Sequence, residues 1–307
     1  MNSVVLYTVI SLSGIGVTAA IVLFLVAQKF KVYEDPRIDQ VEDELPAANC
    51  GGCGFPGCRN FAEALVKAED FEDLYCPVGG NETMGKIAEL LGKVAVTQEP
   101  KVAVLRCNGA CEFRPKVNKY DGTETCVIAA ALYGGDTGCE YGCLGYGDCV
   151  LVCKFDALHM DAETGLPVVT DVNCTACGAC VKECPKNLFE LRKRYKKDRK
   201  IYVACMNEDK GGPAKKSCSV ACIGCTLCFK VCPFDAITMN NNLAFIDSEK
   251  CRLCRKCAPV CPTDSILEIG FPPKKEQTED NKTEQSTTLA EDKSDEVNNK
   301  PDNISEK

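Results

Sequence analysis

The chain has 307 residues, including 25 cysteines and a single histidine but no tryptophan, and its formal net charge is −8. Disulfide-rich domains are typically short, so this length, together with the cysteine spacings described below, excludes a disulfide scaffold. The acidic balance also argues against nucleic-acid binding, which requires a basic surface.

The first predicted element is a membrane-spanning helix within residues 1–28. No charged residue occurs from Val4 to Ala27, a stretch long enough for a helix to cross a bilayer. A cleaved signal peptide would need a basic start, a shorter apolar core and a small-residue cleavage site, and none of these is evident. Lys29 and Lys31 follow the helix and no basic residue precedes it. We therefore expect a single-pass protein of the inner membrane with the bulk of the chain in the cytoplasm.

Residues 34–92 are predicted to form a small helical domain around four cysteines. The segment ANCGGCGFPGC and a later cysteine give the spacing C-x2-C-x4-C-x17-C, and its glycines allow a loop to wrap closely around a cluster. Two amphipathic helices, one through Phe61 and Leu65 and one with an apolar face at Met84, Ile87, Leu90 and Leu91, complete the domain. Four such cysteines bind iron–sulfur clusters or zinc, and the neighbouring ferredoxin spacings favour the cluster. The predicted ligands are Cys50, Cys53, Cys58 and Cys76.

The body of the chain contains three runs with the spacing C-x2-C-x2-C-x3-C, each followed by proline. In this motif three thiolates bind one [4Fe-4S] cluster and the fourth binds the neighbouring cluster, so the runs work in pairs. A fourth, imperfect run completes a repeated unit, which indicates two duplicated ferredoxin-like modules. We place the modules at residues 136–190 and 218–270, with connectors at 100–135 and 201–217.

The first module pairs an intact run with the imperfect one. Internal alignment places Tyr146 where the second module has Cys225, so one ligand is missing. Cys139 lies one helical turn before Cys143 and is expected to supply the missing sulfur. The predicted ligand sets are Cys139, Cys143, Cys149 and Cys184 for one cluster, and Cys153, Cys174, Cys177 and Cys180 for the other.

The second module pairs two intact runs, and its ligands follow from the motif without substitution. The predicted sets are Cys222, Cys225, Cys228 and Cys261 for one cluster, and Cys232, Cys251, Cys254 and Cys257 for the other.

Five cysteines remain outside these sets. They either form part of a sixth cluster or are reduced thiols that pack as small apolar side chains. The sixth cluster would use Cys107, Cys111, Cys126 and one of Cys205 or Cys218. The odd total leaves at least one cysteine unused if every cluster takes four. The expected cofactors are therefore five or six [4Fe-4S] clusters.

Two further segments are defined by their charge. Seven basic residues lie between the modules and are either a solvated connector or a docking patch for an acidic electron donor; they are Arg192, Lys193, Arg194, Lys196, Lys197, Arg199 and Lys200. Residues 271–307 are polar and charged, and we expect them to be disordered because they cannot bury a core.

The membrane helix, the NCGGCGFPGC motif with Cys76 and the ferredoxin repeats together resemble the B subunit of the Rnf complex, an ion-translocating ferredoxin:NAD oxidoreductase. The resemblance covers residues 1–270 and fits the longer members, which carry two ferredoxin modules. It implies an electron-transfer component of a translocase complex that takes electrons from soluble ferredoxin and passes them to membrane and flavin subunits. The expected fold is α+β, with the membrane helix, the four-cysteine domain, two ferredoxin-like modules and a disordered tail.

Two other functions remain open from the sequence. One is a polyferredoxin component of a different redox complex, of the hydrogenase or heterodisulfide-reductase type, and the other is a zinc-binding membrane adaptor. No residue pattern supplies hydride chemistry or a flavin or nicotinamide site. We therefore expect electron transfer without a complete active site for NAD reduction, with other subunits and the lipid bilayer as partners.

Overall fold

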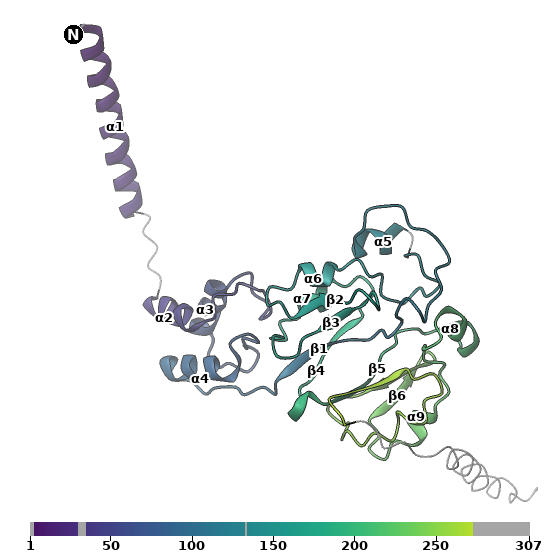
Figure 1. The fold of residues 1–307 in the computed structure, drawn as a ribbon. Helices are drawn as coiled ribbons and strands as arrows, with labels where there is room; N and C mark the ends of the chain where they lie inside the picture. Colours follow the sequence, from purple (N-terminus) through teal and green to yellow (C-terminus); the bar gives the residue numbers. More distant parts are fainter. Residues whose placement is uncertain (1–2, 30–34, 133, 273–307) are drawn as a thin grey trace, which may run out of the picture.

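The computed structural model describes residues 3–29, 35–132 and 134–272 (Figure 1). In this part of the chain, short helices alternate with antiparallel strands, which confirms the predicted α+β class. The predicted disordered tail at 271–307 lies outside the described residues, apart from its first two positions.

The first helix, α1, spans Ser3–Lys29 and is the long helix at the purple end of Figure 1. Its segment Leu6–Lys29 has a mean hydropathy of 2.5, and no other helix in the described ranges is long and apolar enough to cross a membrane. Its large apolar side chains are exposed along its length, among them Leu12 and Phe24. The helix therefore has the length and the apolar surface of a single membrane span.

The four-cysteine domain is built from three helices: α2 (Pro36–Glu44), α3 (Cys58–Lys67) and α4 (Gly80–Leu91). The predicted apolar faces of α3 and α4 meet in its core, where Phe61, Leu65, Met84 and Ile87 are almost fully buried. Leu90 is 38% exposed, so the buried face of α4 is narrower than predicted. This core fixes the direction in which α3 leaves the cysteine loop.

The strands of the described residues form four two-stranded antiparallel sheets. Each ferredoxin-like module has one sheet from its first and last strands and one inner hairpin. The strands of the first module are β1 (Lys101–Leu105) with β4 (Phe189–Lys193), and β2 (Leu158–Met160) with β3 (Pro167–Val169). Those of the second module are β5 (Lys200–Val203) with β8 (Ile266–Ile269), and β6 (Ile237–Asn240) with β7 (Leu243–Ile246).

Short helices separate these strands and carry several of the cysteines. They are α5 (Cys126–Leu132), α6 (Asp148–Leu151), α7 (Ala179–Glu183), η1 (Lys196–Asp198), α8 (Gly211–Ser217) and α9 (Leu227–Lys230).

The segments expected to be connectors supply the first strand of each module. Strand β1 lies within 100–135 and pairs with β4, and β5 overlaps 201–217 and pairs with β8. The last pairs of the two ladders are Leu105 with Phe189 and Val203 with Ile266. The two modules therefore have the same arrangement of strands. In each module a cysteine follows the first strand: Cys107 in the first module and Cys205 in the second.

The two modules pack against each other through β1 and β5, where Val104, Tyr202 and Ala204 form a small buried cluster. Two residues of the basic segment lie in this junction. Arg192 is buried and donates to the carbonyl oxygens of Ile201 and Ile246, at 3.4 and 2.6 Å.

Lys200, the other buried basic residue, forms an ion pair of 2.6 Å with Asp171. The basic segment is therefore not uniformly a solvated connector or a docking patch, because its first and last cations are structural.

Candidate metal centres

The cysteines gather into six groups of four, which we number along the molecule. In each of sites 1 to 5 the four thiols line one cavity, and in site 6 the thiols are close neighbours of one another. Site 1 contains Cys50, Cys53, Cys58 and Cys76; site 2 contains Cys153, Cys174, Cys177 and Cys180; site 3 contains Cys126, Cys143, Cys149 and Cys184. Site 4 contains Cys107, Cys139, Cys205 and Cys218; site 5 contains Cys222, Cys225, Cys228 and Cys261; site 6 contains Cys232, Cys251, Cys254 and Cys257.

Site 1 is formed by the glycine-rich loop before α3 and by the segment before α4. The side-chain oxygen of Asn49 accepts a hydrogen bond of 2.8 Å from the backbone N–H of Cys58, which holds the loop against the start of α3. Backbone N–H groups of Gly52 and Gly79 point to the sulfurs of Cys50 and Cys76, at 3.4 and 3.3 Å. Such N–H···S contacts stabilise thiolates bound to iron.

The loop of site 1 lies directly against the loop of site 2. A Cβ atom added to Gly52 would stand only 2.9 Å from the carbonyl oxygen of Cys177, so glycine permits this close approach. Lys154 donates to the carbonyl oxygen of Asn49 at 3.1 Å and holds the two loops together. The four-cysteine domain is therefore in contact with the first ferredoxin-like module through residues that border the two sites.

The thiols that the structure brings together at site 3 differ in one cysteine from the set expected from the sequence. The thiol that joins Cys143, Cys149 and Cys184 is that of Cys126, at the start of α5, and not that of Cys139. The backbone of Tyr146 hydrogen-bonds to the Cys126 thiol. A cysteine from the preceding segment thus compensates for the tyrosine in the motif.

Sites 2 and 3 are neighbours within the first module. Burial raises the pKa of Cys149 to about 12, and the nearby thiols of Cys126, Cys184 and Cys180 add to this effect. Because Cys180 belongs to site 2, the two groups of thiols are close enough to interact electrostatically.

Site 4 lies between the modules and takes two cysteines from each. Cys107 and Cys205 stand at equivalent positions, two residues after β1 and β5. Cys139 and Cys218 are equivalent in the internal alignment of the two repeats. The structure does not bring together the expected sixth set of Cys107, Cys111, Cys126 and one further cysteine, because Cys126 lines the cavity of site 3 and Cys107 lines that of site 4 with Cys139.

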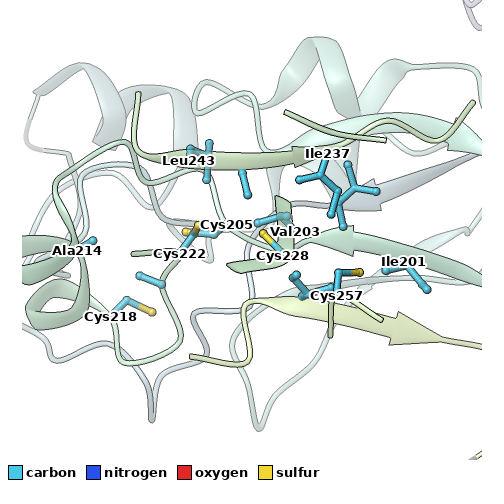
Figure 2. Close-up of a cluster of buried hydrophobic side chains, with 14 residues drawn as sticks. Ile201, Val203, Cys205, Ala214, Cys218, Cys222, Cys228, Ile237, Leu243 and Cys257 are labelled. Carbon is cyan, nitrogen blue, oxygen red and sulfur yellow. The ribbon is translucent and has the colours of Figure 1, made fainter. Parts of the chain in front are cut away.

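Sites 5 and 6 occupy the core of the second module. Figure 2 shows Cys205, Cys222, Cys228 and Cys257 among the apolar side chains of this core, such as Val203. Burial raises the pKa of Cys228 to about 11 and that of Cys257 to about 12. Metal binding at these two buried thiols would therefore have to displace their protons.

Cys261 of site 5 differs from the other buried ligands of this module. Burial acts to raise its pKa, but hydrogen bonds from Ser265 and Thr263 outweigh burial and lower it. The hydroxyl oxygen of Ser265 lies 3.2 Å from the sulfur.

Site 4 also contacts the sites on either side of it. The pKa of Cys143 in site 3 is raised by burial and then by the thiol of Cys107 in site 4. The pKa of Cys205 in site 4 is raised by burial to about 12, and its next neighbours include the thiol and backbone of Cys222 in site 5. Site 5 continues to site 6 through Cys228, which acts on Cys257. In the part of the chain that the structure describes, these contacts connect the six sites in one series.

Cys111 is the cysteine that these six groups leave out. It is exposed, and its backbone N–H donates to the carbonyl oxygen of Thr164 at 3.1 Å. The odd number of cysteines predicted one such residue, although the sequence did not indicate which one.

The donor sets fit polynuclear iron–sulfur clusters better than single ions. Zinc draws four sulfurs to about 2.3 Å from one point. In the part of the chain that the structure describes, no three Cys, His, Asp or Glu side chains are close enough together to hold one metal ion. Groups of four thiols around an apolar cavity are instead suited to a cubane, in which each sulfur binds a different iron.

Family models match the chain at both ends of the series. A family model for an Fe-S cluster (FeS) matches residues 45–77, which include all four thiols of site 1. A family model described as 4Fe-4S dicluster domain matches residues 221–265, which include sites 5 and 6. The chain therefore contains domains of the 4Fe-4S type.

Curated proteins resemble the chain over most of its length. The B subunit of the Na⁺-translocating ferredoxin:NAD⁺ oxidoreductase complex of Acetobacterium woodii is 44% identical over 83% of this chain and 75% of its own length. The B subunit of the ion-translocating oxidoreductase complex of Methanosarcina acetivorans is 40% identical over 83% of this chain and 94% of its own. The B subunit of the proton-translocating ferredoxin:NAD⁺ oxidoreductase complex of Clostridium ljungdahlii is 41% identical over 83% and 88%, respectively.

Proposed function

The chain belongs to the family of B subunits of ion-translocating ferredoxin:NAD oxidoreductase complexes, and we propose that it carries electrons through six [4Fe-4S] clusters arranged in one series. The 4Fe-4S dicluster domain of this chain and its apolar helix α1 agree with an iron–sulfur subunit of a membrane-bound redox complex. The proposal assigns the number of clusters, their ligands and their order.

The observation that carries this proposal is the continuous series of thiol groups. Each site is in contact with the next one, either through a cysteine or through a loop residue that neighbours a cysteine. The first of these contacts is between Gly52 and Cys177, and the last is between Cys228 and Cys257. Electron transfer between clusters requires such short separations, whereas six isolated structural metal sites would have no need of them.

The protein donates hydrogen bonds to selected sulfurs of the sites. Each cubane accepts and returns one electron when bound. Backbone N–H groups at Cys50 and Cys76 and hydroxyl groups at Cys261 donate to sulfur. Because these contacts differ from site to site, the chain sets the reduction potential of each site separately.

We place the cysteine-bearing body on the cytoplasmic side, with soluble ferredoxin as the electron donor or acceptor. Lys29 and Lys31 follow the apolar helix, in agreement with the positive-inside rule. The relatives from Acetobacterium woodii and Clostridium ljungdahlii carry ferredoxin in their names. We place NAD reduction on another subunit, because the cavities that form sites 1 to 5 are each lined by the four thiols of a cluster site.

The proposal is tested by purifying the full-length chain anaerobically in detergent and measuring iron, acid-labile sulfide and zinc. We expect about 24 iron atoms per chain, as six cubanes require, and reduction of all clusters by reduced ferredoxin without NAD or flavin. A control chain with Cys111→Ser should retain the same iron content. Stoichiometric zinc in place of iron, or a content of about 12 iron atoms or fewer, would contradict the proposal.

A further inference from the structure

Sites 3 and 4 are adjacent, but their cavities contain buried side chains of opposite charge. Asp148 lines the cavity of site 3 and is 9% exposed, whereas Arg114 lines the cavity of site 4 and is 4% exposed. Glu183 and Lys186 also line site 3, but they are only partly buried and their charges oppose each other. Among the residues that line the two cavities, the buried charges are therefore one anion and one cation; the buried Arg106 lies outside both linings and donates to the carbonyl oxygen of Cys205.

Arg114 is held close to the sulfurs of site 4. It donates from Nη1 to the carbonyl oxygen of Cys143, a residue of site 3 whose thiol its charge also reaches, while its buried Nε has no hydrogen-bond partner among the described residues. A Cβ atom added to Gly109 would lie 3.4 Å from Arg114 Cδ and 3.3 Å from Cys218 Sγ, so the side chain and the sulfur border the same small space. Burial raises the pKa of Cys107, and the charge of Arg114 acts against this effect.

A second polar side chain supports the same site. Asn207 is fully buried, and its side-chain N–H₂ donates to the sulfur of Cys139 at 3.6 Å. Its backbone N–H donates to the sulfur of Cys205 at 3.4 Å. Three of the residues around site 4 therefore present positive charge or hydrogen-bond donors: Arg114, Asn207 and Gly109.

Asp148 has the opposite effect at site 3. Its Oδ2 accepts a hydrogen bond of 3.2 Å from the backbone N–H of Val127, but its buried Oδ1 has no partner among the described residues. Burial raises the pKa of Cys126, hydrogen bonds from the backbone of Asp148 and Tyr146 act against this effect, and the negative charge of the Asp148 carboxylate adds to it. The ligands of site 3 therefore lie beside an anion that disfavours additional negative charge.

We propose that Arg114 and Asp148 set a step in reduction potential between sites 3 and 4, with site 4 the more readily reduced of the two. The inference rests on the assignment of clusters to these sites. Reduction adds one negative charge, which a buried guanidinium stabilises and a buried carboxylate destabilises, both strongly at low dielectric. The electron lost by site 3 is the one gained by site 4, and no bond or proton changes in the exchange.

This step lies at the only junction between the modules in the series of sites that the structure describes. Site 4 takes half of its ligands from each module, so an electron that passes from sites 1 to 3 to sites 5 and 6 must cross it. A more readily reduced site at this point would hold an electron between the two halves of the chain. Arg114 is thus a tuning residue for the passage between the modules.

The test is an EPR-monitored redox titration of the full-length, anaerobically purified chain. Cys139→Ser identifies the signal of site 4 and Cys126→Ser that of site 3. Arg114→Gln is expected to lower the midpoint potential of the site 4 signal, and Arg114→Lys to restore most of it. Asp148→Asn is expected to raise the midpoint potential of the site 3 signal.

The matched control is Lys116→Gln. Lys116 lies two residues from Arg114, and its substitution by glutamine removes the same charge. Lys116 differs from Arg114 because it is exposed, pairs with Asp136 and lines none of the cavities that form sites 1 to 5. Its substitution should leave both potentials nearly unchanged because solvent screens the charge.

A site 4 potential that shifts no more in Arg114→Gln than in Lys116→Gln would overturn the inference while leaving the cluster assignments intact. If Arg114→Gln fails to retain iron at site 4, Asp148→Asn decides the matter: an unchanged site 3 potential overturns the step, and a raised one supports it. A Cys139→Ser chain that keeps every cluster signal would instead overturn the assignment of site 4 itself.

Discussion

The two ferredoxin-like modules have the same strand plan but complete their first cluster site in different ways. Site 5 takes Cys225 from within its own motif, whereas site 3 has Tyr146 at that position and takes Cys126 from the segment before the motif. The backbone of Tyr146 hydrogen-bonds to the Cys126 thiol. The comparison teaches that a ligand position can move outside the spacing of a motif when a preceding loop brings a thiol to the same point in space.

The largest expected effect is the loss of a cluster, and it distinguishes Cys126 from Cys139 as the fourth thiol of site 3. Cys126→Ser should remove the cluster of site 3, and Cys139→Ser should remove that of site 4, each with a loss of about four iron atoms. The measurement is iron content together with the EPR spectrum of the reduced chain. If Cys139→Ser and Cys126→Ser remove the same signal, the comparison between the modules is wrong.

A second change converts the first module to the pattern of the second. Tyr146→Cys in a Cys126→Ser background should restore the site 3 cluster, because the new thiol occupies the position that Cys225 has in site 5. The restored signal and iron content are the measurement, and Tyr146→Phe in the same background is the control. Restoration by the phenylalanine variant would contradict the geometric reason for the rescue.

A smaller effect concerns the junction that holds the modules together. Arg192→Gln should cost about 2 kcal/mol at this junction, because the carbonyl oxygens of Ile201 and Ile246 lose a buried donor. The measurement is limited proteolysis under native conditions, where cleavage between the modules should become more than tenfold faster. Lys196→Gln, an exposed position in the same segment, should cleave at the rate of the unchanged chain.

The smallest expected effect concerns the different hydrogen bonds that equivalent cysteine sulfurs make in the two modules. Cys261 of site 5 has hydroxyl neighbours, whereas the equivalent Cys184 of site 3 accepts from the backbone N–H of Leu188. Ser265→Ala should lower the potential of site 5 by about 40 mV, which corresponds to one hydrogen bond of roughly 1 kcal/mol. The exposed Ser217→Ala is the control for the redox titration, and an equal shift in both variants would refute the role of the hydroxyl.

The sequence was sufficient to group the cysteines wherever the spacing of the motif was intact. For sites 1, 2, 5 and 6, the expected quartets are those that the structure brings together, because their ligands lie in short loops or in paired runs. Sites 3 and 4 required information on residues far apart in the chain. The choice between Cys126 and Cys139 depends on where the segment before α6 folds, and no local spacing encodes that.

The strands of the modules show the same limit. The stretches ending at Leu105 and Val203 are apolar and strand-like, but their pairing partners lie beyond the last cysteine of each module. One signal was present in the sequence: Cys107 and Cys205 follow equivalent strands, and Cys139 and Cys218 align in the repeats. Combined, these two correspondences would have given site 4, whereas the burial of Arg192 and Lys200 follows only from the packing of the modules.

The divided origin of site 4 also bears on how the molecule is completed during synthesis. Neither half of the chain contains more than two of its four thiols, so a ribosome that has released only the first module presents Cys107 and Cys139 as an open pair. The site can be filled only after the second module has folded and docked. Occupancy of this one site would therefore be a chemical record that synthesis has passed Cys218, and a product truncated before that residue would be recognisable by its absence.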